Sequence, residues 1–327
     1  VYKRQGLKAV AFTDVIQVCL LIFAGLFVSY GGLNALSDGN GVIKGFAILQ
    51  SNFPEKFDAI LPYVDKETDP VAYGNYVKLP GIWVLIGGMW IAHFYYWGTN
   101  QYITQRALGG KSLDEAQKGL MFAGFLKIFM PIVVVLPGLI AVALEGNVIE
   151  SLGGDRSKAY PSMLSLLPNG ILGLTFAALV AAIVSSLASL TNSLSTIFTM
   201  DIYKNYTKVK DTELVNVGRL AGMSGLILSI IVAPIFLGSL DSAFQYVQEY
   251  MGLFSPVILF VFLSAIFFKK SSSKSVLAGS LVALIVGVFM KLYVAQTDQS
   301  LIEPFMHQMA ISFGIAFLIS FALSDKS

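Results

Sequence analysis

The stretch that decides the fold class is Gly87-Gly88-Met89-Trp90-Ile91-Ala92-His93-Phe94-Tyr95-Tyr96-Trp97-Gly98-Thr99-Asn100-Gln101. It is apolar enough for the interior of a bilayer, yet glycines interrupt it and His93, Asn100 and Gln101 are polar. A helix that only crossed a membrane would avoid this combination, because every backbone polar group in hydrocarbon needs a partner. Irregular, polar backbone is tolerated there where it lines a cavity, so the stretch predicts a broken membrane helix at a transporter's substrate site.

The composition of the whole chain also indicates a membrane protein. Of its 327 residues, 55% are hydrophobic and 13% are charged, whereas a soluble domain carries about 25% charged residues. The net charge of +2 gives no reason to expect nucleic acid as a partner, and the single cysteine, Cys19, allows no disulfide within the chain. The sequence contains no Walker motif, nucleophile–base pair or metal-ligand cluster, which argues against ATP-driven transport and against an enzyme.

About eight segments are long and apolar enough to cross a bilayer, since a spanning helix needs about 20 apolar residues. They are residues 8–30, 80–103, 118–144, 170–198, 215–237, 243–268, 275–295 and 304–324. Turn-forming residues separate them, for example Tyr30-Gly31-Gly32 and Leu167-Pro168-Asn169-Gly170. We expect an all-α, multi-pass protein of the cell (inner) membrane, in which residues 1–327 form one transmembrane domain.

The distribution of basic residues predicts the orientation in the membrane. Lys3, Arg4 and Lys8 flank the first span, and Lys269 and Lys270 follow the sixth. The alternate loops are poorer in Lys and Arg, so the basic loops are predicted to be cytoplasmic. The long segment 31–79 then faces out, and its mixed stretch at 52–57 suggests a surface helix.

Among the ionisable residues inside predicted spans, where such groups are costly and usually functional, three stand out. Asp14 either has a functional role or lies near the interface and pairs with a lysine. Lys127 either snorkels to the interface or hydrogen-bonds within a cavity. Glu249 follows Gln245 and Gln248, which are three residues apart and share one helix face. These three polar side chains form either a solute-contacting patch or a helix-capping network at the outer surface.

The fourth span is rich in small residues and could hold a sodium ion. Hydroxyl and carbonyl oxygens are the ligands that a hard cation prefers. Ser185 and Ser186 supply hydroxyls, and the carbonyl of Ala182 lies on the neighbouring turn. Close helix packing through small residues is the alternative explanation. Tyr95, Tyr96 and Trp97 likewise either form an interfacial aromatic belt or stack on a solute and gate its path.

Distinctive short motifs are spread over nearly the whole chain. They are Phe12-Thr13-Asp14-Val15-Ile16-Gln17, Tyr95-Tyr96-Trp97-Gly98, Asn100-Gln101-Tyr102-Ile103, Gln105-Arg106, Glu115-Ala116-Gln117-Lys118-Gly119, Ile183-Val184-Ser185-Ser186-Leu187-Ala188-Ser189, Thr199-Met200-Asp201-Ile202-Tyr203-Lys204, Val215-Asn216-Val217-Gly218-Arg219, Phe244-Gln245-Tyr246 and Gln248-Glu249-Tyr250. Together they resemble the solute:sodium symporter family, and its sugar-transporting branch in particular. The resemblance implies a leucine-transporter-type fold of two inverted five-helix repeats, of which this chain begins at core helix five. Because the chain starts at Val1 without a methionine, we expect it to be truncated at its N-terminus.

The resemblance also implies roles for individual residues. It places a sodium site at Ala182, Ser185 and Ser186, with Asp14 on the sodium exit path. It implies sugar contacts from Lys127 and Gln248, to which the shared face adds Gln245. It makes Tyr96 a gate beneath the sugar, with Trp97 beside it. His93 stands where galactose-transporting members have a sugar-contacting asparagine, so the preferred sugar is left open.

We therefore predict a symporter that imports a galactose- or glucose-like sugar with sodium as the coupling ion, by alternating access and without a cofactor. Its partners are sodium, the sugar and the lipid bilayer. Inositol, an amino acid, an organic anion or sialic acid is the alternative solute within the family. A transporter-like sensor module and a channel are the alternative classes of protein.

Overall fold

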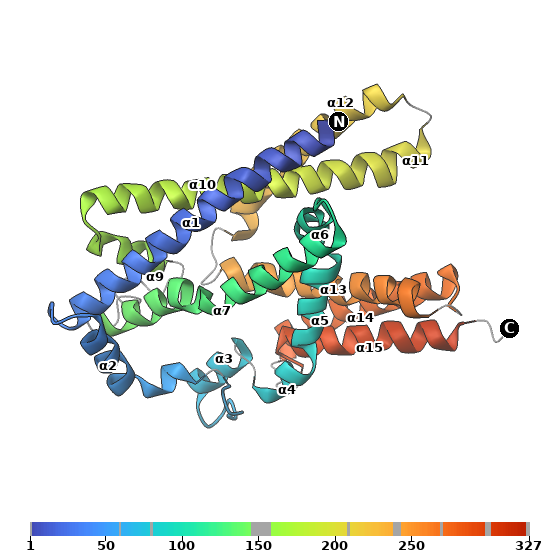
Figure 1. Cartoon of the computed structure of the whole chain (residues 1–327). Helices are drawn as coiled ribbons and strands as arrows, with labels where there is room; N and C mark the ends of the chain where they lie inside the picture. Colours follow the sequence, from blue (N-terminus) through green and yellow to red (C-terminus); the bar gives the residue numbers. More distant parts are fainter. Residues whose placement is uncertain are drawn as a thin grey trace. The chain divides into compact units, whose positions relative to one another are not determined.

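The computed structural model describes the chain except for residues 1, 59, 79–80, 145–157, 208–209, 238–242, 269–270, 298–301 and 325–327. All regular secondary structure in the described residues is helical (Figure 1). Within the described part of the chain, seven helices are long and apolar enough to cross a membrane, and one bent pair of helices makes an eighth candidate. The prediction of an all-α, multi-pass membrane protein with about eight spans is therefore confirmed.

The helices form two compact units, each described here by itself. The first unit contains Val1–Phe57 and Gln101–Ser242, and the second contains Asp58–Asn100 and Ala243–Ser327. That both units belong to one transmembrane domain, as the sequence suggests, stays a prediction.

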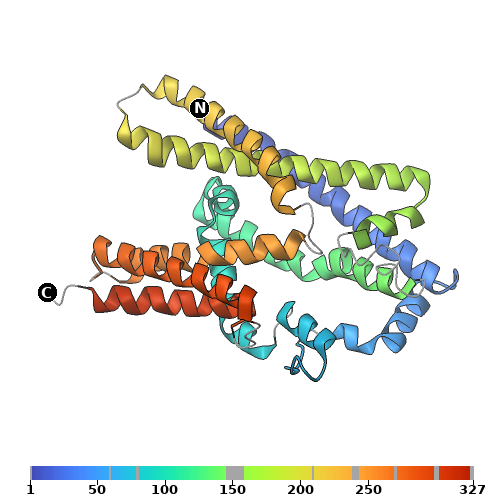
Figure 2. The same ribbon diagram turned by 180° about the vertical axis from the view of Figure 1, so that it is seen from behind.

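The first unit is built around the long helices α1, α7, α10 and α12. Its elements are α1 (Tyr2–Leu36), α2 (Val42–Asn52), the 3-10 helix η1 (Pro54–Phe57), α6 (Gln101–Leu108), α7 (Leu113–Ala143), α9 (Ala159–Met163), the 3-10 helix η5 (Leu164–Leu166), α10 (Asn169–Thr196), the π-helix η6 (Ile197–Tyr203), α11 (Lys204–Tyr206) and α12 (Asp211–Leu237). Helix α1 packs against α7 and α10, and α10 packs against α12, as both views show (Figures 1 and 2). The core under α1 buries Val28, Leu33, Leu49, Ile140 and Met163.

The break expected at Tyr30-Gly31-Gly32 is wrong, because α1 continues through these residues to Leu36. Gly32 serves close packing instead of a turn. A Cβ atom there would lie 2.5 Å from Met163 Cε and 2.8 Å from Ile140 Cγ2. The chain turns after the helix, where Gly39 and Gly41 have φ angles of 81° and 99° that glycine adopts without strain.

The second unit contains the C-terminal helices and residues 87–100 of the glycine-interrupted, polar stretch. Its elements are α3 (Pro70–Lys78), α4 (Ile82–Ile86), α5 (Gly88–Phe94), the π-helix η2 (Tyr95–Thr99), α13 (Ala243–Phe267), α14 (Ser273–Thr297) and α15 (Phe305–Ala322). Helix α15 packs against α13, α14 and α5. The hydrophobic core between α13, α14 and α15 buries Phe260, Ala283 and Ala316. Small residues at such crossings let the backbones approach closely, as membrane helices require.

Candidate functional site

The expected broken helix is present in the second unit. Its two helical parts, Pro70–Ile86 and Gly88–Thr99, are bent by 84° at Gly87. The next residue, Gly88, is buried against α15, where a Cβ atom would lie only 1.9 Å from the carbonyl oxygen of Met306. Glycine at this position therefore allows the backbone of α5 to touch the backbone of α15.

The aromatic residues of the broken helix lie on the π-helix η2. The amide of Asn100 donates to the carbonyl of Tyr95 at 3.0 Å, five residues back. Single π-turns within helices occur frequently at functional sites. Tyr96 is half-buried and its ring meets Trp97 edge to face, with centroids 5.3 Å apart. His93, one turn earlier on α5, is exposed.

A polar patch on α13 lies in the same unit. Gln245, Gln248 and Glu249 are all partly buried, and the Nε2 amide of Gln245 lies 3.4 Å from Oε1 of Glu249. The other carboxylate oxygen of Glu249 accepts from Nζ of Lys291 on α14 at 3.0 Å. Lys291 is an intramembrane cation that the sequence reasoning missed. Its place inside the predicted span 275–295 was the available signal.

Four of the five predicted sugar-contacting residues lie on helices of the second unit that pack against one another. Helix α13, which carries Gln245 and Gln248, packs against both α5 and η2, which carry His93 and Tyr96. Lys127 lies on the exposed surface of α7 in the first unit. That these five side chains contact a sugar stays a prediction.

Asp14 lies at the centre of a polar cluster in the first unit. Arg106 on α6 reaches its Oδ2 atom with Nε at 3.0 Å and Nη2 at 2.9 Å. The hydroxyl of Ser185 on α10 donates to its Oδ1 atom. The cation that pairs with Asp14 is therefore an arginine from α6, and the lysine weighed as its partner in the sequence was the wrong residue type. In the sequence, Arg106 stands out only through its motif with Gln105.

The same arginine connects α6 to α10. Arg106 Nη2 donates to the hydroxyl of Ser189 at 2.7 Å, and its Nη1 donates to the carbonyl of Tyr102 at 2.9 Å. The neighbouring Gln105 accepts from Nδ2 of Asn192 at 2.9 Å. Ser185 and Ser189 are four residues apart, so they form one face of α10 that is directed at α1 and α6.

The predicted sodium ligands lie around this cluster on α10. Ser185 is 9% exposed, Ala182 is partly buried and Ser186 is exposed. The carboxylate of Asp14 is within hydrogen-bond reach of the Ser185 hydroxyl, so an anionic oxygen adjoins one of the three positions. Sodium binding at these residues stays a prediction.

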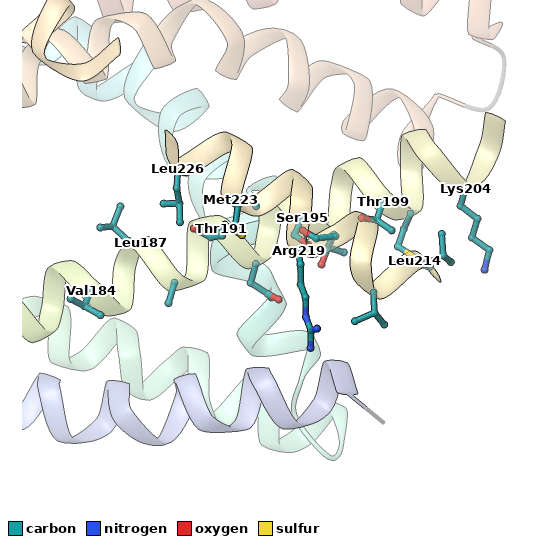
Figure 3. Close-up of a pocket in the computed structure, with 17 residues that line it drawn as sticks. Val184, Leu187, Thr191, Ser195, Thr199, Lys204, Leu214, Arg219, Met223 and Leu226 are labelled. Carbon is teal, nitrogen blue, oxygen red and sulfur yellow. Dashed lines mark hydrogen bonds between the residues drawn. The ribbon is translucent and has the colours of Figure 1, made fainter. Parts of the chain in front are cut away.

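A cavity of about 1050 Å³ is bounded by α10, η6 and α12 (Figure 3). Thr191, Ser195 and Thr199 give it a polar strip, and Lys204 and Arg219 add basic groups. Apolar side chains from both long helices complete the lining. Ser185 and Ser186 are not among its described lining residues, so this cavity differs from the predicted sodium site.

Comparison with known proteins finds similarity to sodium-coupled transporters over most of the chain. The model of the "Sodium:solute symporter family" matches residues 5–287. The chain is 45% identical over 318 residues to a sodium/glucose cotransporter of Vibrio parahaemolyticus, which covers 93% of this chain and 56% of that protein. It is 32% identical to sodium/myo-inositol cotransporter 2 of Oryctolagus cuniculus, over 93% of this chain and 46% of that protein.

A third relative is sodium/glucose cotransporter 4 of Danio rerio, which is 30% identical over 86% of this chain and 45% of its own length. The chain thus spans about half the length of the curated relatives that it matches. The family match covers far more than half of the chain, and it agrees with the membrane helices described above. The chain belongs to the sodium:solute symporter family.

Proposed function

We propose that this chain forms part of a carrier that uses a sodium gradient to import a neutral sugar. The observation that carries the proposal is the packing of α13 against α5 and η2. It gathers amides, an imidazole and aromatic rings within one unit. Amides and imidazole can hydrogen-bond to sugar hydroxyls, and a tyrosine ring can stack on a sugar's apolar face.

In this proposal the first unit supplies the sodium site. Sodium binds near Ala182, Ser185 and Ser186. These three residues offer oxygen ligands and carry no positive charge themselves. It then leaves past Asp14, for which Arg106 and sodium are alternative partners. Sodium binding favours the outward-facing state and thereby sugar binding between Lys127, His93, Gln245 and Gln248, above the gate formed by Tyr96 and Trp97.

The energy for import comes from the sodium gradient and the membrane potential. One positive charge moving through 100 mV yields about 2.3 kcal/mol, before any concentration term is added. The carrier acts in the cell (inner) membrane and catalyses no covalent step. A neutral cyclic polyol such as inositol is the second candidate solute, because a myo-inositol cotransporter is 32% identical.

The proposal is tested by transport with the complete protein in membrane vesicles. Uptake of labelled galactose, glucose and myo-inositol is measured with an inward sodium gradient and with potassium as control. Ser186→Ala should raise the sodium concentration needed for half-maximal uptake. Ser229→Ala is a matched control, because Ser229 is an exposed membrane-helix serine whose hydroxyl donates to the carbonyl of Gly225 at 2.8 Å within its own helix.

Sodium-dependent uptake of a sugar that Ser186→Ala weakens and Ser229→Ala preserves would support the proposal. Sodium-dependent uptake of myo-inositol alone would replace the solute and keep the mechanism. Absence of sodium-coupled uptake of all three would overturn the assignment of a neutral polyhydroxyl solute.

A further inference from the structure

Lys291 and Glu249 form an ion pair between two membrane helices. Glu249 is six residues from the start of α13, and Lys291 is six residues from the end of α14. Both lie roughly 9 Å inside their helices at a rise of 1.5 Å per residue. Their side chains are 32% and 25% exposed, and Nζ of Lys291 lies 3.0 Å from Oε2 of Glu249. The pair is thus sheltered from water on most of its surface.

The pair also contacts the polar patch that is proposed to bind the sugar. Lys291 Nζ lies 4.5 Å from the ring centroid of Tyr250, a cation–π distance. The second oxygen of Glu249 faces the amide of Gln245 at 3.4 Å. The carboxylate therefore has Lys291 on one oxygen and Gln245 on the other. Holding the carboxylate in this position also orients the Gln245 amide.

The electrostatic consequence concerns the charge of the solute. A lone carboxylate beside Gln245 and Gln248 would attract a cationic solute and repel an anionic one. Paired with Lys291, Glu249 contributes no net charge, and the patch offers neutral amides. Such a surface gives a cationic solute no electrostatic advantage over a neutral, hydroxylated molecule.

We propose that Lys291 is a positioning residue that acts through Glu249: it orients Gln245 and cancels the carboxylate charge, which keeps the patch on α13 from favouring a cationic solute over a neutral one. This inference rests on the proposed function, because it takes Gln245 and Gln248 as sugar contacts. No comparison or sequence motif above assigns a role to Lys291.

The test compares four variants of the complete carrier. Lys291→Met leaves Glu249 without its cation, whereas Lys291→Arg keeps the charge. The double variant Lys291→Met with Glu249→Gln removes both charges and so restores neutrality without the ion pair. Lys118→Met is the matched control, since it breaks an ion pair of 2.7 Å with Asp114 whose side chains are 74% and 69% exposed.

Transport assays measure the selectivity between a neutral and a cationic sugar. Inhibition of labelled galactose uptake by galactose and by galactosamine is compared below the pKa of the amino group. Lys291→Met should increase the preference for galactosamine over galactose by about two- to twentyfold relative to the wild type. This range takes a separation of roughly 9 Å between the amino group and the Glu249 carboxylate, with screening between that of water and that of a protein surface. It should raise the KM for galactose more than it lowers the maximal rate.

Rescue of the selectivity ratio by second variants distinguishes an electrostatic role of Lys291 from a merely structural one. Lys291→Arg and the neutral double variant should both return the selectivity ratio toward the wild-type value, and Lys118→Met should not change it. A ratio unchanged in Lys291→Met, or one that the double variant fails to restore, would overturn the inference.

Hydrogen exchange provides a readout that does not depend on transport. The peptide covering residues 243–252 of purified Lys291→Met should exchange faster than in the wild type, because its anchor to α14 is lost. Unchanged exchange would refute the positioning role whatever solute is carried. If the wild-type carrier takes up no sugar, the proposed function fails, and the exchange rates still decide whether Lys291 orders the start of α13.

Discussion

Replacing Arg106 with glutamine tests whether the Asp14 cluster holds α1, α6 and α10 together. The variant removes both nitrogens that contact Asp14 and the donor to Ser189, while Ser185 still donates to the carboxylate. The Arg106 and Asp14 side chains are 34% and 21% exposed. The Asp14 carboxylate is then left mostly buried with a single donor, so α10 loses its charged link to α6.

The expected loss in the free energy of unfolding follows from the intermediate exposure of the two side chains. Exposed ion pairs contribute about 0–1 kcal/mol, and removing one partner of a buried pair costs about 3–5 kcal/mol. We expect Arg106→Gln to destabilise the first unit by about 1–3 kcal/mol, with the exposed part of the arginine reducing the upper value. Asp14→Asn should have a similar effect, because it leaves Arg106 without its counterion.

A double-mutant cycle measures the interaction directly. Thermal unfolding of the complete carrier is compared for wild type, Arg106→Gln, Asp14→Asn and the double variant. The double variant should be little worse than the more damaging single variant, giving a coupling of about 1–3 kcal/mol. The same cycle at Asp114 and Lys118, an exposed pair, should give at most about 0.5 kcal/mol. Additivity within about 0.5 kcal/mol at Arg106 and Asp14 would show that the two residues act independently and would refute the reasoning.

Two further predictions concern the fold around the site. Gly88→Ala should cost about 1–3 kcal/mol or more through overpacking, because the new Cβ would lie 1.9 Å from the Met306 carbonyl oxygen; Gly74→Ala, with no atom within 4 Å, is the control. Equal thermal midpoints for these two variants would contradict the close contact between α5 and α15. Ser112→Ala should lower stability by about 1 kcal/mol, because the Ser112 hydroxyl caps α7 by accepting from the Glu115 amide at 3.2 Å. Ser51→Ala, which removes a hydroxyl that donates to Ile48 within its own helix, should have less effect on the thermal midpoint, and a larger effect there would count against the cap.

Most of the helices could be predicted from the sequence, because bilayer thickness fixes how long an apolar segment must be. Helix α13 was expected over 243–268 and lies at Ala243–Phe267. The break in the second span was also predicted correctly, from glycines beside polar residues at 87–101. The expectation of a turn at Gly31 and Gly32 was wrong for a physical reason. Glycine permits a turn and permits close helix packing equally well, and only the neighbouring Ile140 and Met163 side chains show which one applies.

Less of the candidate site could be predicted, because the partners of a charge come from elements distant in sequence. Asp14 was recognised as an unusual membrane residue, but Arg106 is 92 residues away and Ser185 is 171 residues away. Lys291 was overlooked although Glu249 was singled out, since helical periodicity gives no information on contacts between helices. The residue types therefore indicated where charges must be satisfied, and the fold identified the partners.

The Lys291–Glu249 pair has a consequence for biogenesis. A single charged side chain makes insertion of a membrane helix less favourable, by about 2.5–3.5 kcal/mol at the helix centre and by less nearer an end, where Glu249 and Lys291 lie. Helix α13 ends at Phe267 and α14 begins at Ser273, so the two helices are consecutive and closely connected. Entering the bilayer together as a hairpin lets opposite charges neutralise each other during insertion. The glutamate in α13 is thus accommodated in the bilayer at lower cost when the helix that follows enters with it.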